Sequence, residues 1–480
     1  MSSLLIIVVF CALLPHTPAQ TVITLAGGSS PGTTSGSTDG FGSAALFNAP
    51  RGVAVDTSGA VYVADFGNHK IRLIRPNRTV VTFAGSTLGS SDGVGSAALF
   101  NCPTGVAVDS SGTVFVADSE NHKIRLIHPN RTVITLAGGA TSGSADGVGS
   151  AALFWSPFGV AVDASGAVYV ADNRNHKIRL IYLNRTVVTL AGSTLGSADG
   201  VGSAALFNFP LGIALGTSGA VYVADYDNHR IRLIYPNRTV VTLAGSAIGF
   251  ANGIGPAALF NGPIGVAVDI SGAVYVADII NHKVRLIYPN RSVISLAGST
   301  LGSNNGIGTA ALFNIPYGVA LDAYGSVIVA DRDNHKIRFI YPFSCSPGTF
   351  ANFTERKCIV CPPGSFSSAS SAESCSLCPG GTFAKPYGSS SCAVCPEGHA
   401  CPPGTSSWAR LNCGRGNYCP EGSSGPIPCP IQTVPVPYAS WASHPMTAQG
   451  PAFFVETSVC LNHCFWNFTT GSGDGMLSKC

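Results

Sequence analysis

Six histidines recur along the chain at almost constant spacing, and their side chains are the first candidates for chemistry. Each lies in an Asn-His-Lys or Asn-His-Arg tripeptide, and the intervals are 53, 54, 53, 53 and 53 residues. They are His69, His122, His176, His229, His282 and His335. Imidazole is a frequent metal ligand, but side chains at one position of every repeat lie on a ring too wide to share one ion. We therefore expect a scaffold role, with each imidazole bonded to the Asp that precedes it (Asp65 in the first unit); a metal-binding or catalytic histidine is the alternative.

A second recurring group consists of carboxylates at the end of the first β-like run of each unit. They are Asp56, Asp109, Asp163, Asp269 and Asp322, with Gly216 at the equivalent position of the fourth unit. Oxygen ligands suit calcium, so a ring of carboxylates at one mouth of a channel is one interpretation. The other is that each Asp opens a tight D-x-S-G turn by accepting hydrogen bonds from its own backbone, and we expect this role.

Residues that differ between the units are better candidates for function, because catalysis and recognition need asymmetry. The position between Pro and Gly before the first run holds Arg51, Thr104, Phe158, Leu211, Ile264 and Tyr317. This set and the residues before each Asn-His pair are mixed apolar and charged, which is typical of an interface and not of a nucleophile with its base. We predict no catalytic residue, cofactor or metal, and a partner-binding surface made of Arg51, Phe158, Tyr226, Tyr317 and Arg332.

The elements that position these residues follow from the repeat. Each unit has four β-like runs, in the first unit Gly52–Asp56, Ala60–Asp65, His69–Ile74 and Thr79–Gly85, separated by turn residues. Six such units predict an all-β, six-bladed β-propeller. The sixth unit lacks its fourth run, and an orphan copy, Thr21–Gly27, precedes the first unit. We expect this N-terminal strand to complete the sixth blade and close the ring.

These repeats resemble the NHL family through the run G-V-A-V-D…V-Y-V-A-D…N-H-[KR]-I-R, over residues 21–341. The resemblance implies a propeller but leaves function open, because NHL-like propellers include RNA binders, extracellular sensor and adhesion domains, and a peptide-amidating lyase. We expect no nucleic-acid partner. The Lys and Arg residues alternate along strands, and the net charge is only +3.

The compartment follows from the N-terminus. Leu4–Leu14 is an apolar run of 11 residues, too short to span a bilayer, and small residues precede Gln20. We predict a signal peptide over residues 1–19, a propeller over 20–343, no membrane span and secretion.

Fourteen of the 16 cysteines lie from Cys345 onward. Secretion favours disulfides over zinc. The stretch 344–430 resembles ephrin-receptor-like and tumour-necrosis-factor-receptor-like cysteine-rich repeats. The repeated loop favours the pairs Cys345–Cys358, Cys361–Cys375 and Cys378–Cys392, although spacing alone does not fix connectivity. Cys102 should remain a thiol. Residues 431–480 form a Pro- and aromatic-rich tail with three cysteines.

Glycosylation sequons mark one side of the predicted disc. Five of them fall in the turn between the third and fourth runs, at Asn77, Asn130, Asn184, Asn237 and Asn290; Asn352 and Asn467 lie further on. The alternative is that Asn simply suits the turn. We predict that an extracellular protein or glycan docks on the opposite face and that the chain is a secreted or cell-surface binding or adhesion scaffold. The alternative function is a secreted amidating-lyase-like or lactonase-like propeller enzyme with a channel metal.

Overall fold

The computed structural model describes residues 20–28, 34–341, 345–352, 357–368, 372, 374–409, 411–414 and 417–428. The predicted signal peptide, Asn467, Cys429 and the tail from 431 lie outside this range. The chain divides into two compact units between Ser344 and Cys345. Within the described ranges, no helix has the length and apolar character needed to cross a membrane.

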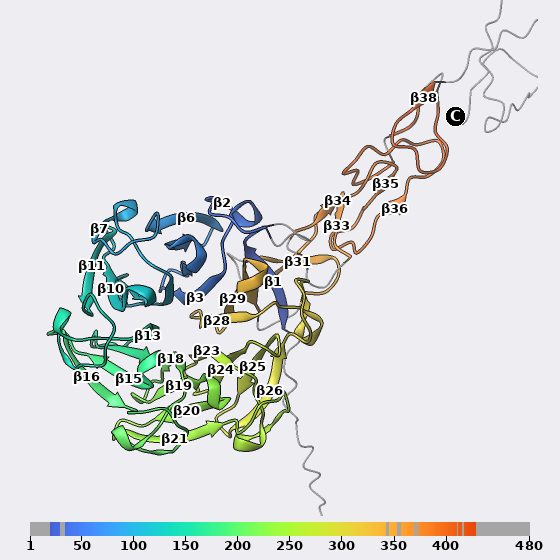
Figure 1. Ribbon diagram of the computed structural model, residues 1–480. Coiled ribbons are helices and arrows are strands. Elements are labelled where there is room, and N and C mark those ends of the chain that lie inside the picture. The colour runs from blue at the N-terminus through green and yellow to red at the C-terminus, as the bar shows by residue number, and fades with distance from the viewer. Residues whose placement is uncertain are drawn as a thin grey trace, which may run out of the picture. The chain divides into compact units, whose positions relative to one another are not determined.

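The first unit is a six-bladed propeller, as predicted (Figure 1). The first strand of each blade lies innermost, and neighbouring inner strands contact one another around the whole ring. The inner strands are β3 (Pro50–Val55), β8 (Pro103–Val108), β13 (Pro157–Val162), β18 (Pro210–Leu215), β23 (Pro263–Val268) and β28 (Pro316–Leu321). The second strands are β4 (Val61–Asp65), β9 (Val114–Asp118), β14 (Val168–Asp172), β19 (Val221–Asp225), β24 (Val274–Asp278) and β29 (Val327–Asp331).

The third and fourth strands complete the antiparallel core of each blade. The third strands are β5 (Lys70–Ile74), β10 (Lys123–Ile127), β15 (Lys177–Ile181), β20 (Arg230–Ile234), β25 (Lys283–Ile287) and β30 (Lys336–Ile340). The fourth strands are β6 (Thr79–Ala84), β11 (Thr132–Ala137), β16 (Thr186–Ala191), β21 (Thr239–Ala244), β26 (Ser292–Ala297) and, in the sixth blade, β1 (Thr21–Ala26). β1 pairs with β30, with Ile23 opposite Phe339, so the N-terminal strand closes the ring as predicted.

A short fifth strand, which the sequence interpretation did not anticipate, covers the outer edge of every blade. These strands are β2 (Gly40–Phe41), β7 (Gly93–Val94), β12 (Gly147–Val148), β17 (Gly200–Val201), β22 (Gly253–Ile254) and β27 (Gly306–Ile307). Each is followed by a one-turn 3-10 helix: η1 (Gly42–Ala44), η3 (Gly95–Ala97), η5 (Gly149–Ala151), η7 (Gly202–Ala204), η9 (Gly255–Ala257) and η10 (Gly308–Ala310). A two-residue edge offers little template for pairing with another chain.

Glycines allow neighbouring inner strands to approach one another closely. A Cβ on Gly52 would meet the carbonyl oxygen of Thr104 in the next blade, and one on Gly318 would meet that of Arg51. Only glycine fits such a backbone approach. The same relation holds at Gly52, Gly105, Gly159, Gly212, Gly265 and Gly318.

A buried ion pair repeats in all six blades. In the first, both side chains are fully buried, and the Arg72 guanidinium donates to Asp65 at 2.8 Å. Arg72 also reaches Asp39 at 2.7 Å and lies 5.2 Å from the Phe47 ring. Asp65 accepts further bonds from the Asn48 amide and the Asn68 side chain, both at 2.8 Å. The pairs are Asp65–Arg72, Asp118–Arg125, Asp172–Arg179, Asp225–Arg232, Asp278–Arg285 and Asp331–Arg338.

The recurring histidines connect blades, which confirms their scaffold role but corrects the partner. The prediction that His69 bonds to Asp65 is wrong, because the Asp65 carboxylate accepts its hydrogen bonds from Arg72 and from the two Asn residues named above. Instead, His69 adopts a left-handed backbone conformation and its Nδ1 accepts the Cys102 amide of the next blade at 3.1 Å. His335 closes the series by accepting the Ala49 amide of the first blade at 3.0 Å. All six imidazoles make the equivalent bond.

The arginines of the N-R-T or N-R-S turns connect blades in the other direction. Arg185 lies in the turn between β15 and β16, and its guanidinium donates to the carbonyl oxygens of Leu136 and Thr135, each at 2.8 Å, in the preceding blade. Arg78 makes the corresponding bond to Leu25 of β1 at 3.1 Å. The recurring histidines and these turn arginines therefore both link neighbouring blades of the ring.

The second unit is a stack of small disulfide-bridged hairpins. Its strands are β31 (Thr349–Asn352), β32 (Lys357–Val360), β33 (Ser365–Phe366), β34 (Ser376–Leu377), β35 (Thr382–Phe383), β36 (Ala393–Val394), β37 (Asn417–Tyr418) and β38 (Ile427–Pro428). The bridges Cys345–Cys358, Cys361–Cys375 and Cys378–Cys392 agree with the favoured pairing.

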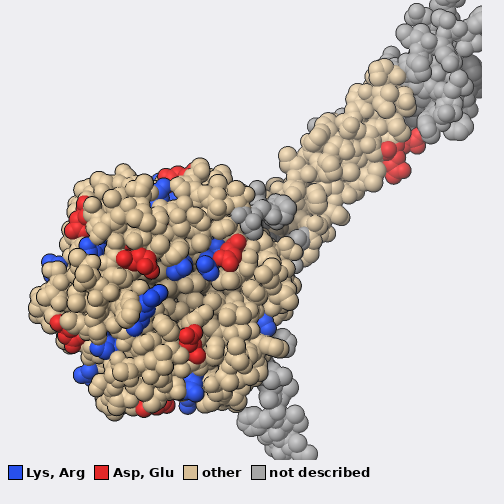
Figure 2. Space-filling model, viewed as in Figure 1, with Lys and Arg blue, Asp and Glu red and all other residues tan. Residues whose placement is uncertain are grey.

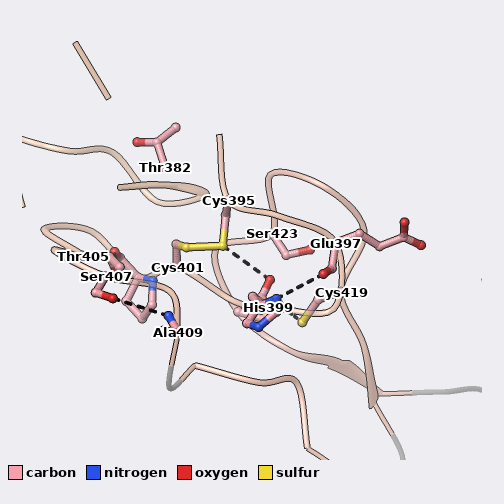
Figure 3. Close-up of a disulfide and its surroundings, with 12 residues drawn as sticks. Thr382, Cys395, Glu397, His399, Cys401, Thr405, Ser407, Ala409, Cys419 and Ser423 are labelled. Carbon is pink, nitrogen blue, oxygen red and sulfur yellow. Dashed lines mark hydrogen bonds between the residues drawn. A yellow bond between two sulfur atoms is a disulfide. The ribbon is translucent and has the colours of Figure 1, made fainter. Parts of the chain in front are cut away.

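Two further bridges among the described residues close shorter loops than the first three. Cys395–Cys401 and Cys413–Cys419 each join residues six apart. The first closes a loop in which the Cys395 sulfur lies 3.5 Å from the His399 carbonyl oxygen (Figure 3). The His399 ring lies 4.7 Å from Trp408, so an aromatic contact supports the loop where the regular repeat ends.

Candidate binding site

The residues predicted to bind a partner gather where the six inner strands meet. Phe158 and Tyr317 come from opposite blades, three and six, and their ring centroids are 5.8 Å apart. Leu211 and Ile264 belong to the same buried cluster, and Tyr226 packs against it. The residues that follow the first Pro of the blades therefore pack together across the propeller axis. We call this cluster the plug. Side chains therefore fill the axis at the end where the inner strands begin, whereas the repeated carboxylates follow the opposite end of these strands.

Arg51 is the charged centre of this plug. Its guanidinium carbon lies 3.3 Å from the Phe66 ring centroid and 5.2 Å from that of Tyr317. Burial lowers the pKa of Arg51, and the nearby charge of Arg332 acts in the same direction. Arg332 lies 5.6 Å from the Tyr317 ring and pairs with Asp333 at 3.4 Å. The stacked guanidinium groups make an aromatic and cationic surface.

Tyr317 has a different position from the one expected of a contact residue. It is 7% exposed, and burial raises the pKa of its phenol although Arg51 and Arg332 oppose the shift. Arg51, Phe158, Tyr226 and Arg332 are partly exposed. Tyr317 therefore packs beneath the exposed residues of this surface. Substitution of Tyr317 by a charged residue would disturb the packing of the plug as well as any interface.

The sequence interpretation missed Trp155, which is 42% exposed and lies two residues before β13, the strand that carries Phe158. It replaces an Asn that occupies the same position in the other five blades, and its amide still donates to Asp172 at 2.8 Å. Arg174 contacts it, with the guanidinium 5.9 Å from the indole ring. The available signal was the single departure from a repeated Asn. We call Trp155, Arg174, Arg51, Phe158 and Arg332 the mouth patch.

Charges around the mouth are mixed. Figure 2 shows basic and acidic side chains interspersed around the centre of the propeller face in view. In the turns before the recurring histidines, Glu120, Arg174 and Asp227 are exposed. Their spacing gives the rim a polar character around an aromatic centre, which is the usual anatomy of a protein interface.

The repeated carboxylates are used in turns, as expected. Asp56 accepts the Ser58 and Ala60 amides at 2.9 and 3.0 Å, and Asp109, Asp163 and Asp269 repeat this pattern. Among the described residues, no group of three or more His, Cys, Asp or Glu side chains is arranged to hold a metal ion.

The five propeller sequons lie on the other side of the disc. Asn77, Asn130, Asn184, Asn237 and Asn290 are all exposed, and each accepts the amide of the residue two positions later at 3.0 Å. Asn352 lies in β31 of the second unit. The turn role is therefore present at the five propeller sites, and glycosylation remains a prediction.

Comparisons with known proteins agree with this architecture. The NHL repeat model matches residues 47–72, 100–125, 154–179 and 207–232. The propeller is built from NHL repeats. A model described as tyrosine-protein kinase ephrin type A/B receptor-like matches residues 348–395 of the cysteine-rich unit.

Relatives of the NHL-repeat chain are similar to its propeller part. NHL repeat-containing protein 2 of Bos taurus is 28% identical over 357 residues, which cover 65% of this chain and 49% of that protein. Teneurin-3 of Danio rerio is 28% identical, with 40% of this chain and 8% of that protein covered. The chain thus spans about half the length of the first of these relatives. An auxiliary nutrient binding protein from Bacteroides thetaiotaomicron shares the fold, with 16% identity, a TM-score of 0.52 and coverage of 67% and 76%.

Proposed function

We propose that this chain is an extracellular interaction scaffold that binds a protein partner through the mouth patch. The observation that carries the proposal is the plug itself. Residues repeated in every blade hold the ring together, whereas the residues that differ meet at one mouth. Exposed Trp and Arg side chains around an aromatic centre are the residue types enriched in interface hot spots.

Extracellular placement rests on the second unit. The five disulfides among the described residues and the ephrin receptor-like match favour an oxidising compartment. The alternative is an enzyme with a metal in the axial channel, and the side chains that fill the axis at the start of the inner strands disfavour it.

Binding of the purified full chain to cells of its source organism tests the proposal. Changing Trp155→Ala and Arg174→Ala together should weaken saturable binding at least about tenfold, because each such anchor contributes about 1–2 kcal/mol or more. Tyr324, which is 69% exposed in a turn on the sequon side, provides the matched control Tyr324→Ala. Protease treatment of the cells should abolish binding. Equal binding by both variants, or loss only with Tyr324→Ala, would place the site elsewhere.

A further inference from the structure

The five sequon turns of the propeller share one backbone arrangement. In the third blade, the Tyr182 amide donates to Thr186 at 2.9 Å, and the Arg185 amide donates to Tyr182 at 2.8 Å. Arg185 has a positive φ of 64°. The Asn184 Oδ1 accepts the Thr186 amide at 3.0 Å. The carbonyl end of the Asn side chain is thus fixed to the turn, and the Nδ2 atom, which would carry an N-linked sugar, belongs to an exposed and oriented amide.

The turns differ in the residue two positions before the Asn. Blades three, four and five have Tyr182, Tyr235 and Tyr288 there, whereas blades one and two have Arg75 and His128. Tyr182 and Tyr235 remain 47% and 44% exposed. Both tyrosine rings are thus about half exposed to solvent, close to the turn of their hairpin.

The register of the hairpin places each ring beside its sequon. Ile181 lies opposite Val187, so the next pair outward, Tyr182 and Thr186, also face each other. Directly opposed residues of an antiparallel pair project to the same side. The Tyr ring and the sequon Thr therefore share one side of the hairpin, and the glycosylatable Asn lies between them in sequence at the turn.

We propose that N-linked sugars on Asn184, Asn237 and Asn290 pack their first residue against the tyrosine two positions earlier and stabilise these three blades. In the transfer, Nδ2 loses a proton and bonds to the anomeric carbon of a lipid-diphosphate-linked oligosaccharide, and the lipid diphosphate leaves. The C–H face of a pyranose is apolar and complements an aromatic face. Asn77 and Asn130 lack this ring, so sugars there give no comparable gain.

Stabilisation of the turn also reaches the neighbouring blade. Arg185, between Asn184 and Thr186, donates to the Leu136 and Thr135 carbonyl oxygens of blade two. Arg238 makes the equivalent bond to Leu190 of blade three at 2.9 Å. A sugar that orders the turn therefore orders an inter-blade contact, on the side of the disc opposite to the mouth patch.

A thermal double-mutant cycle on the full chain, secreted from a eukaryotic host, tests this inference. The variants are Tyr182→Ala with Tyr235→Ala, Thr186→Val with Thr239→Val (which removes both sequons and keeps the Asn), and all four together. The tyrosine changes should lower Tm by about 2–4 °C in the glycosylated chain and by much less without the sequons. Tyr288 is left unchanged because it also packs against a buried cluster.

Blades one and two provide the matched control. Arg75→Ala with His128→Ala, combined with Thr79→Val and Thr132→Val, should give additive changes in Tm. Mass spectrometry of glycopeptides establishes occupancy. Absence of sugar on Asn184 and Asn237, or equal loss of Tm from the tyrosine changes in both backgrounds, overturns the proposal. Either result leaves the mouth patch untouched, since binding is measured separately with the Trp155 and Arg174 variants.

Discussion

The histidines act as structural acceptors, which makes stability depend on pH. Each Nδ1 accepts an amide proton, so the imidazole must be unprotonated there. Burial lowers the pKa of His69, His176, His282 and His335, although nearby carboxylates oppose the shift. A folded pKa below the unfolded value means that the stability contributed above pH 6.5 is lost as pH falls through the folded pKa.

We therefore expect Tm to fall between pH 7 and pH 5. Replacing these four histidines by Asn, which tolerates the left-handed backbone, should lower Tm at pH 7.5 and flatten its dependence on pH. Scanning calorimetry across this range measures both effects. An unchanged slope in the variant would mean that other groups cause the acid loss.

Stability should also depend on the protonation of the partly exposed carboxylates that pair with the buried arginines. Burial by itself would raise the pKa of Asp39, Asp92 and Asp146, but a threonine amide and the arginine charge outweigh it and lower the pKa. Their stabilisation is thus present above pH 3.8 and lost as pH falls through the lowered pKa. Blades five and six carry Asn252 and Asn305 instead.

Substituting these three Asp residues by Asn should consequently lower Tm at pH 7 and reduce its drop between pH 5 and pH 3. The measurement is Tm against pH for parent and variant. If Tm falls as much in the variant as in the parent between pH 5 and pH 3, the three carboxylates do not cause the loss of stability in acid.

Within a blade, the buried ion pair is the most sensitive contact. Arg232→Leu leaves Asp225 buried without its charge partner, so unfolding free energy should fall by about 3–5 kcal/mol. Arg230→Ala, on the same strand, is the control, because Arg230 makes one hydrogen bond of 3.3 Å to the edge of the blade. Urea unfolding compares the two variants. A similar small loss in both would show that the pair contributes little.

Sequence reasoning recovered elements whose signal is periodic. Repeated runs and turns predicted β3 to β6 and their counterparts, and the orphan copy predicted β1. The fifth strands were missed because two residues carry no alternation. The buried ion pair of Arg72 was not anticipated, since nothing in the local sequence shows that Asp39 and Asp65 contact this side chain in the interior. The plug was missed because it depends on contacts between opposite blades.

At the scale of the whole molecule, the ring is held by backbone pairing and by two sets of side-chain links. His335 to Ala49 and Arg78 to Leu25 both cross the seam between the last and first blades. β1 pairs with β30 inside the sixth blade and so completes the blade from which both links start or to which they lead. The mouth patch depends on this closure, because Phe158 and Tyr317 meet only when blades three and six are held across the axis.

Closure of the ring by β1 is tested by the thermal unfolding of a chain that lacks residues 21–27, compared with the parent. Loss of β1 exposes the edge of β30, so Tm should fall by at least about 10 °C, with aggregation. Addition of a synthetic peptide with the sequence TVITLAG should restore part of the lost Tm, and a scrambled peptide should not. A deletion variant that melts like the parent and binds cells equally well would contradict both the closure and the site built on it.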